Sequence, residues 1–119
     1  MTAAVVQRAG LADEAQARSA GWLINSGLRP GDRLAISAPS SLDYLNVALG
    51  ALRSGMIPVL INTSLLKDEV EYILSDARPA IVMGEHEVDA ATKHHRRAAL
   101  SRWPLGRPMA YTSGTTGQP

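Results

Sequence analysis

The sequence predicts an α/β fold with a partial, mostly parallel sheet and helices on both of its faces. Three short apolar segments, at residues 33–37, 57–61 and 80–84, are typical of strands buried on both sides. Segments with the periodicity of amphipathic helices separate them. The chain has 119 residues, 45% hydrophobic and 19% charged, which suits one globular domain and is too short for two.

The first helix is predicted from about Leu11 to Ser26. Gly27 follows, where a left-handed C-cap is expected, and Pro30-Gly31 makes a turn that cannot continue the helix. Five residues fall on one face of this helix because they recur at helical spacing: Ala12, Ala15, Ser19, Trp22 and Leu23. A short strand over residues 33–37 comes next.

A second helix is predicted to begin at Ser40 or Ser41, both good N-caps, with Asp43 in its first turn. It has a continuous apolar stripe, of the kind that usually faces a core. The stripe consists of Leu42, Leu45, Leu49 and Leu52. Gly55 ends this run. The strand at 57–61 contains Pro58, which lacks an N–H and therefore belongs near the strand start or on an edge.

The remaining elements continue the alternation of helix and strand. The third helix is predicted from the spacing of Leu66, Val70, Ile73 and Leu74. A strand follows at 80–84, then a weaker helix at about 90–100 and a last strand at 109–112. The expected order is therefore α-β-α-β-α-β-α-β, with right-handed crossovers between the strands.

Composition excludes several classes of protein. The chain has no cysteine, which excludes a disulfide framework, a thiolate zinc site and a cysteine nucleophile. No export signal is recognised, so a cytoplasmic location is expected, and a fatty substrate would favour the neighbourhood of a membrane surface. No transmembrane segment is expected, because the most apolar stretch, 42–61, is interrupted by Asp43, Asn46, Arg53 and Pro58.

Charge is unevenly distributed along the chain. Residues 1–89 hold seven Lys/Arg and eleven Asp/Glu, whereas residues 90–119 hold five Lys/Arg and no acid. The basic final part favours an anionic ligand nearby or is simply a solvated helix face. Its densest run, residues 93–97, has no aromatic residue interleaved, so nucleic-acid binding is not expected.

No metal site is expected from the histidines. His86-Glu87 begins like the zinc-protease pattern H-E-x-x-H, but Ala90 stands at the second histidine position. His94 and His95 are adjacent, and on a helix adjacent side chains point about 100° apart, so they do not converge on one ion.

Residues 111–119, Tyr-Thr-Ser-Gly-Thr-Thr-Gly-Gln-Pro, combine two glycines with four small hydroxyl side chains. Glycine allows positive φ and close backbone approach, so that successive N–H groups can turn towards an anion. The hydroxyl donors that suit phosphate oxygens are those of Thr112, Ser113, Thr115 and Thr116. From this chemistry alone, a phosphate-binding loop and a flexible Gly/Ser/Thr tail both remain open.

The nine residues Y-T-S-G-T-T-G-Q-P resemble the phosphate-binding loop of the AMP-forming adenylating enzymes, the superfamily of acyl-CoA synthetases, luciferases and peptide-synthetase adenylation domains. Three upstream segments are also similar to that family: G-L-R-P-G-D-R-L-A-I at 27–36, L-G-A-L-R-S-G at 49–55, and I-N at 61–62 with D-E-V-E-Y-I-L at 68–74. The resemblance covers most of the chain, from about Leu11 to Pro119. Leu66 stands where the family usually places a capping Thr or Ser, a change expected to cost about 1 kcal/mol.

The resemblance implies that residues 1–119 are a single partial unit of the N-terminal domain of such an enzyme, with the phosphate loop at about 109–119. It implies an acid–thiol ligase of the fatty-acid–CoA ligase class, which uses Mg-ATP to convert a carboxylic acid to an acyl-adenylate and then to a coenzyme A thioester. The implied ATP phosphate-binding residues are Thr112, Ser113, Gly114, Thr115, Thr116 and Gly117. No catalytic residue and no metal ligand is assigned within the chain.

Three hypotheses follow. In the first, the chain is part of an acyl-CoA synthetase for a carboxylic acid, with a fatty acid preferred. The acid pocket, the magnesium-binding glutamate and the catalytic lysine of that family lie beyond the phosphate loop, so the 119 residues alone are expected to be inactive. In the second, the chain is an inactive remnant or interaction module, for which an unpaired sheet edge predicts self-association. In the third, it is a simple nucleotide-binding module with millimolar affinity for ATP.

Overall fold

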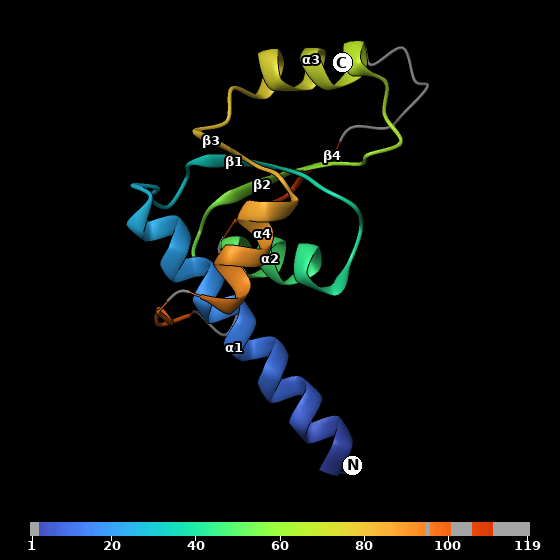
Figure 1. Cartoon of the computed structure of the whole chain (residues 1–119). Coiled ribbons are helices and arrows are strands. Elements are labelled where there is room, and N and C mark those ends of the chain that lie inside the picture. Colours follow the sequence, from blue (N-terminus) through green and yellow to red (C-terminus); the bar gives the residue numbers. More distant parts are fainter. Residues whose placement is uncertain (1–2, 95, 101–105, 111–119) are drawn as a thin grey trace.

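The computed structural model describes residues 3–94, 96–100 and 106–110, and the side chains of residues 10–94, 96–100 and 106–109. Helices and strands alternate in the predicted order (Figure 1). The elements are α1 (Ala3–Asn25), β1 (Arg33–Ser37), α2 (Leu42–Arg53), β2 (Ile57–Ile61), α3 (Lys67–Ala77), β3 (Ile81–Met83), α4 (Glu85–Lys93) and β4 (Met109–Ala110). The predicted fold class is confirmed.

The four strands form one parallel sheet in the order β3-β1-β2-β4. Along this order, the connections from β1 to β2 and from β3 to β4 run towards the β4 edge of the sheet. The connection from β2 to β3 runs the opposite way, towards the β3 edge. Right-handed crossovers therefore place α2 and α4 on one face and α3 on the opposite face. Figure 1 shows this arrangement, with α1, α2 and α4 on one side of the sheet and α3 on the other.

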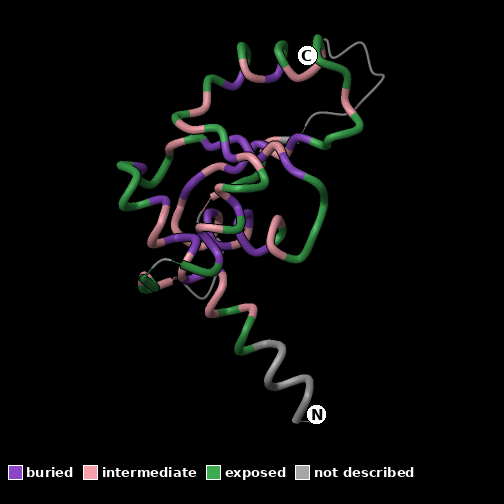
Figure 2. The backbone as a smooth tube through the Cα atoms, viewed as in Figure 1, coloured by how far each residue is buried: buried purple, intermediate pink, exposed green. Residues whose placement is uncertain are grey.

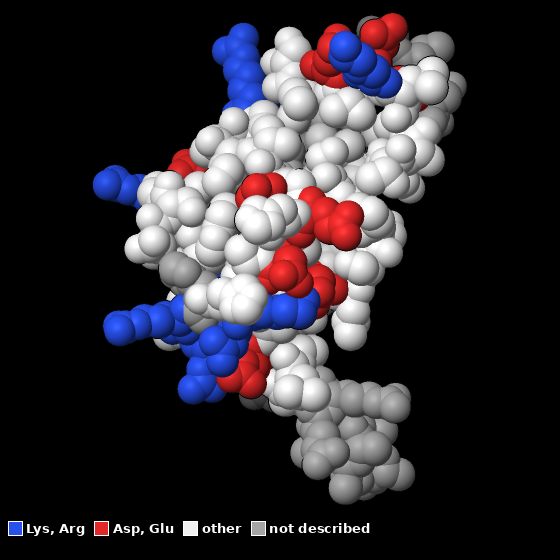
Figure 3. Space-filling view, in the orientation of Figure 1, with Lys and Arg blue, Asp and Glu red and all other residues white. Residues whose placement is uncertain are grey.

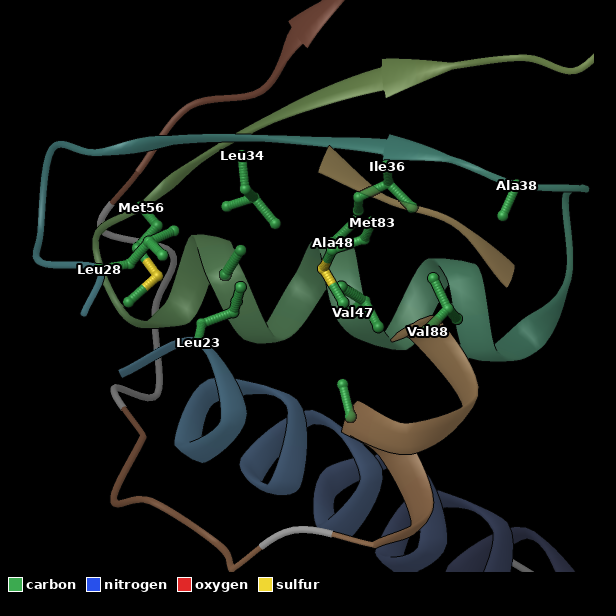
Figure 4. Close-up of a cluster of buried hydrophobic side chains, with 12 residues drawn as sticks. Leu23, Leu28, Leu34, Ile36, Ala38, Val47, Ala48, Met56, Met83 and Val88 are labelled. Carbon is green, nitrogen blue, oxygen red and sulfur yellow. The ribbon is translucent and has the colours of Figure 1, made fainter. Parts of the chain in front are cut away.

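The buried side chains form two clusters, one on each face of the sheet. Figure 2 marks the buried residues along the backbone of the strands and of the helices on both sides of the sheet. The larger cluster joins β1 and β3 to α1, α2 and α4, and Figure 4 shows Leu34, Ile36 and Met83 directed at these helices. The smaller cluster joins β1 and β2 to α3 and includes Val59, Ile61 and Ile73. Strands that are apolar on both sides are thus covered on both sides, as the sequence predicts.

The predicted end of α1 is confirmed. Gly27 has a φ of +96°, its N–H donates to Ile24 O, and the Leu28 N–H donates to Leu23 O. These two hydrogen bonds make a Schellman motif, and Leu23 and Leu28, both buried, supply its apolar contact. The helix begins at Ala3, earlier than the periodicity from Leu11 predicts.

Helix α2 begins as predicted but buries a different face. Ser41 is its N-cap, and the Ser41 Oγ accepts a hydrogen bond from Tyr44 N at 3.1 Å. The predicted leucine stripe is wrong as a core face, because Leu42 is 70% and Leu45 49% exposed. The buried residues are instead Asn46, Val47, Ala48, Gly50 and Ala51.

Small residues allow α2 to approach α1 closely, which explains this difference. A Cβ on Gly50 would lie 2.5 Å from the backbone oxygen of Gln16. Gln16 Nε2 donates to Asn46 Oδ1 at 3.2 Å, and Arg53 Nη1 donates to Gln16 Oε1 at 2.8 Å. If the leucine side of α2 packed against α1 instead, the larger side chains would hold the two helices further apart. The side-chain amides of Gln16 and Asn46 would then lose their hydrogen bond to each other.

Two other boundaries differ from the prediction. Helix α4 covers 85–93 rather than 90–100, because Gly84 N donates to Glu87 Oε1 at 2.8 Å and starts the helix directly after β3. The helix ends at Lys93, and the following chain turns to α1, where Ala98 N donates to Ala17 O at 2.9 Å. Strand β3 is limited to 81–83, the stretch that pairs with β1.

Pro58, as predicted, lies near the start of β2.

Candidate functional site at the carboxyl edge of the sheet

The predicted phosphate-binding residues lie outside the described residues. These are Thr112, Ser113, Gly114, Thr115, Thr116 and Gly117. The site is therefore built from the described elements that lead to this segment. The last of them is β4, which ends at Ala110, directly before it in the sequence.

The carboxyl ends of the four parallel strands lie at one edge of the sheet, at Ser37, Ile61, Met83 and Ala110. Strand β4 pairs with β2 in a register that places Ala110 opposite Leu60. The chain therefore enters the predicted loop beside the end of β2. After β1 the chain leaves for α2 on one face, whereas after β2 it leaves for α3 on the other (Figure 1). In open α/β sheets, this divergence is where ligands bind.

The end of β2 is held by Tyr44 of α2. Its Oη donates to Ile61 O at 3.4 Å, and its backbone N–H is bound by the cap residue Ser41. A tyrosine hydroxyl is a protonated donor at neutral pH, and burial raises the pKa of Tyr44 further above its ordinary value. Tyr44 thereby joins the start of α2 to the edge where β4 arrives. No signal in the sequence distinguishes Tyr44, because on α2 it is one apolar residue among several.

The turn after β2 is stabilised by Asn62. The Asn62 Oδ1 accepts from Ser64 N at 2.9 Å, and Asn62 O accepts from Leu65 N at 3.1 Å. This is an Asx turn, in which the amide side chain replaces a backbone acceptor. The turn leads to Leu66, the N-cap of α3, which makes no side-chain cap hydrogen bond, as the sequence predicts. The Leu66 N–H instead donates to Glu69 Oε1 at 3.0 Å.

A separate hollow of about 600 Å³ opens at the ends of β1 and β3, between the first turns of α2 and α4. Its lining includes three carboxylates and one imidazole. The lining residues are Ala38, Pro39, Ser41, Asp43, Glu85, His86, Val88 and Asp89. Figure 3 shows these acidic side chains gathered in the middle of the molecule over α4.

Lys93 partly neutralises this hollow. Its Nζ lies 2.6 Å from Asp43 Oδ2 and 2.7 Å from Asp89 Oδ1, and so connects α4 to the first turn of α2. The hydrogen bond to Asp43, followed by that to Asp89, raises the pKa of Lys93. The hydrogen bond from Lys93 lowers the pKa of the Asp89 carboxyl. Because the carboxylates outnumber the lysine, the hollow repels phosphate groups and does not suit the phosphates of a nucleotide.

Within the described residues, no group of three His, Asp or Glu side chains is placed to hold a metal ion. His86 lies on α4, and Glu87 caps that helix through Gly84 N. His94 is the exposed C-cap of α4, and its neighbour His95 lies outside the described residues.

Two residues of the basic run, Lys93 at the end of α4 and Arg97 after it, lie close to carboxylates of α4, α2 and α1. Lys93 contacts Asp43 and Asp89, and Arg97 Nη1 lies 3.9 Å from Glu14 Oε1 on α1. Figure 3 shows basic side chains gathered at the lower left, with acidic side chains next to them. For Lys93 and Arg97, these ion pairs favour a solvated, charged surface over an anion site.

Comparison with known proteins places the fold in a family. The model of the AMP-binding enzyme family matches residues 11–104, which are most of the chain. The chain belongs to the AMP-binding enzyme family. This match includes the described elements except β4 and the first turns of α1, and it ends before the predicted loop, so family membership rests on the α/β unit itself.

Two curated members of the AMP-binding family show how far the similarity extends. The long-chain-fatty-acid–CoA ligase FadD13 of Mycobacterium tuberculosis is 38% identical over 66 residues, which are 56% of this chain and 13% of that protein. The 4-hydroxybenzoate–CoA/benzoate–CoA ligase of Rhodopseudomonas palustris is 34% identical over 74 residues, 62% of this chain and 14% of that protein. The chain therefore spans about one seventh of the length of these relatives.

Solved members of the AMP-binding family share the fold. The N-terminal domain of FACL13 from M. tuberculosis, solved with an inhibitor bound, matches 93% of this chain with 35% of its own, at a TM-score of 0.71 and 26% identity. O-succinylbenzoate coenzyme A synthetase of Bacillus subtilis, solved with ATP and a magnesium ion, matches 73% of this chain with 28% of its own, at a TM-score of 0.63 and 22% identity. The unit thus corresponds to part of the N-terminal domain of adenylate-forming enzymes. No helix among the described residues is long and apolar enough to span a membrane.

Proposed function

We propose that this chain forms the first α/β unit of an adenylate-forming ligase, which activates a carboxylic acid with ATP and transfers the acyl group to coenzyme A. One observation carries the proposal: β4 pairs with β2 at Leu60 and Ala110, so the segment that follows it starts at the carboxyl edge. At this edge the connections after β1 and β2 leave on opposite faces of the sheet, the usual position of a ligand in such folds.

The residues of the predicted loop fit a polyphosphate. They offer four hydroxyl donors and two glycines and carry no negative charge. The hollow between α2 and α4, with Asp43, Glu85 and Asp89, offers the opposite chemistry. Mg²⁺ bound with ATP takes its ligands mainly from phosphates and water, with one or two carboxylates, so it requires no dedicated cluster in this unit.

In the proposed reaction, ATP supplies the phosphorus that the carboxylate of the substrate attacks, and pyrophosphate leaves. The contribution of this chain is to hold the β- and γ-phosphates and orient the leaving group, which is the larger part of catalysis at phosphorus. The proposed donors are Thr112, Ser113, Thr115 and Thr116. Gly114 and Gly117 allow the backbone N–H groups to approach the phosphate oxygens.

The proposed acid is a fatty acid and the proposed acceptor is coenzyme A. The similarity to FadD13, a ligase for long-chain fatty acids, supports both choices. The benzoate–CoA ligase is similar over a comparable length and supports the same acceptor with an aromatic acid. An aromatic acid is therefore the competing substrate, and a panel of acids distinguishes the two in a ligase whose acid pocket belongs to the same protein as this chain.

The test is a fusion in which this chain replaces the equivalent part of FadD13, assayed for acid-dependent release of pyrophosphate. The acid pocket of this fusion comes from FadD13, so release with long-chain acids tests whether this chain holds and orients ATP, and not which acid is selected. We expect a loss of at least tenfold in Thr115→Ala, because each donor to a developing charge is worth about 2–4 kcal/mol. Thr63→Ala is the matched control, since Thr63 is an exposed threonine in the turn after β2 at the same edge. A folded fusion that releases no pyrophosphate with any acid would refute the proposal.

The isolated chain is expected to bind ATP no more tightly than millimolar and to release no pyrophosphate. Calorimetric titration of the 119-residue chain with Mg-ATP measures this directly. A micromolar Kd would support a self-sufficient nucleotide-binding module instead.

A further inference from the structure

The strongest feature that the proposed function leaves unused is the outer face of α2, formed by Leu42, Leu45, Leu49 and Leu52. Successive residues of a helix are about 100° apart, which places these four leucines along one side. Leu42 is 70% and Leu45 49% exposed, and Leu49 and Leu52 are half-buried. The opposite sides of α2 contact the sheet and α1 through the small buried residues, among which Figure 4 labels Val47 and Ala48.

The charged residues of α2 do not interrupt this outer face. Asp43 binds Lys93 of α4, and Arg53 Nη1 lies 2.7 Å from Asp13 Oδ1 of α1. Helix α2 is thus apolar both on the sides that face the core of this unit and on its outer side. This all-round apolar pattern is typical of a helix buried inside a larger structure. Solvent exposure of several leucines in one row is uncommon for a surface that remains in water.

Among the described residues, the chain before β4 contacts one end of the outer face. Gly106 N donates to Leu52 O at 2.9 Å, so the described chain before β4 crosses the last turn of α2. A Cβ on Gly106 would clash with the backbone oxygen of Met56, which shows how closely this crossing is packed. Leu42 and Leu45, at the other end of the helix, remain open.

We propose that an apolar layer from the remainder of the adenylate-forming N-terminal domain packs on the outer face of α2, so that α2 is an interior helix of that domain. The size of the solved relative supports this occupant. The FACL13 N-terminal domain matches nearly the whole of this chain with only 35% of its own length, which leaves most of that domain to form further layers. The proposal rests on family membership and not on acid activation.

A second copy of this chain is the less suitable occupant. The row from Leu42 to Leu52 is about 15 Å long, at about 1.5 Å per residue. A stable interface between separate chains needs about 800 Å² on each partner, which is more than one row of four leucines supplies. A layer in the same domain is already tethered and does not pay the entropy of association.

The test uses thiol labelling, because the chain contains no cysteine. Leu42→Cys reports on the outer face, and Leu66→Cys is its matched control, since the two leucines are 70% and 71% exposed and Leu66 lies at the start of α3 on the other side of the sheet. Each variant is labelled with a maleimide in the isolated chain and in a cysteine-free fusion with the rest of the FACL13 N-terminal domain. Circular dichroism confirms that each protein is folded.

We expect both cysteines to react rapidly in the isolated chain. In the fusion, the labelling rate of Leu42→Cys should be at least tenfold lower than in the isolated chain. The labelling rate of Leu66→Cys should differ less than twofold between the two proteins. Equal labelling of Leu42→Cys in the chain and the fusion would overturn the proposal. Protection of Leu42→Cys in the isolated chain that increases with protein concentration would also overturn it, in favour of a second copy.

A Leu45→Cys variant repeats the measurement one turn further along α2, in case the first substitution prevents folding. Pyrophosphate release by the FadD13 fusion described above separates this inference from the proposed function, because the FACL13 fusion contains an N-terminal domain only. Protection without release would support the packing of α2 and refute acid activation, and release without protection would do the reverse.

Discussion

The contact between α1 and α2 at Gly50 makes a quantitative prediction. In an exposed helix, replacing glycine by alanine stabilises by up to about 1 kcal/mol, because alanine loses less backbone entropy on folding. At Gly50, however, the new Cβ would lie 2.5 Å from Gln16 O, a backbone atom that moves only if the whole helix moves. Overpacking of this kind costs about 1–3 kcal/mol, so Gly50→Ala should be destabilising.

Gly10→Ala in α1 is the matched control, because nothing lies within 4 Å of a Cβ at that position. Urea and thermal unfolding, followed by circular dichroism, measure both variants. In a domain of this size each kcal/mol shifts the Tm by about 4–8 °C. Gly50→Ala should therefore lower the Tm and Gly10→Ala should raise it. If Gly50→Ala were as stable as the wild type, the close approach of α1 and α2 would be wrong.

Three further predictions concern the edge of the sheet. Leu66→Ser supplies the missing N-cap of α3 and should raise the free energy of unfolding by about 1 kcal/mol; no gain in urea denaturation would argue against Leu66 as the cap. Tyr44→Phe removes the hydrogen bond to Ile61 O and should lower the free energy of unfolding by about 0.5–1.5 kcal/mol. An unchanged urea midpoint would mean that water replaces the hydroxyl. The third prediction is a dependence on pH. The pKa of Asp89 is lowered from 3.8, so its contribution to stability is present above that pH and is lost as the pH falls through the folded value. The pKa of Lys93 is raised from 10.5, so its contribution is present below that pH and is lost as the pH rises through the folded value. Lys93→Met should flatten both limbs of the curve of unfolding free energy against pH, and an unchanged curve would show that the ion pairs contribute nothing.

The strands and caps were largely predictable, because they depend on local signals. Residues 33–37 and 57–61 are strands with the predicted bounds, and Gly27 and Ser41 cap their helices as expected. Backbone preferences at glycine, serine and proline act within a few residues of the chain and need no tertiary partner. The predicted fold class followed from these local signals together with the alternation of helix and strand.

The burial of α2 was not predictable in the same way. Leucine periodicity indicated one face, but the helix buries the small face that contains Gly50 and Ala51. The choice depends on the distance between α1 and α2 and on a buried amide pair 30 residues apart, Gln16 with Asn46, neither of which leaves a periodic signal. The extent of α4 was missed for a related reason, since its start depends on Glu87 reaching back to Gly84 N and its end on a contact with α1.

The candidate site likewise has features that the sequence predicts and features that depend on tertiary packing. The sequence alone determined the class of fold, the order of the elements and a segment, 111–119, whose residue types suit phosphate. Only the tertiary structure decided that β4 joins β2, that Tyr44 holds the end of β2, and that the carboxylates of α2 and α4 share one lysine. Local preferences are encoded in neighbouring residues, whereas strand order and the meeting of distant charges depend on how the complete chain packs.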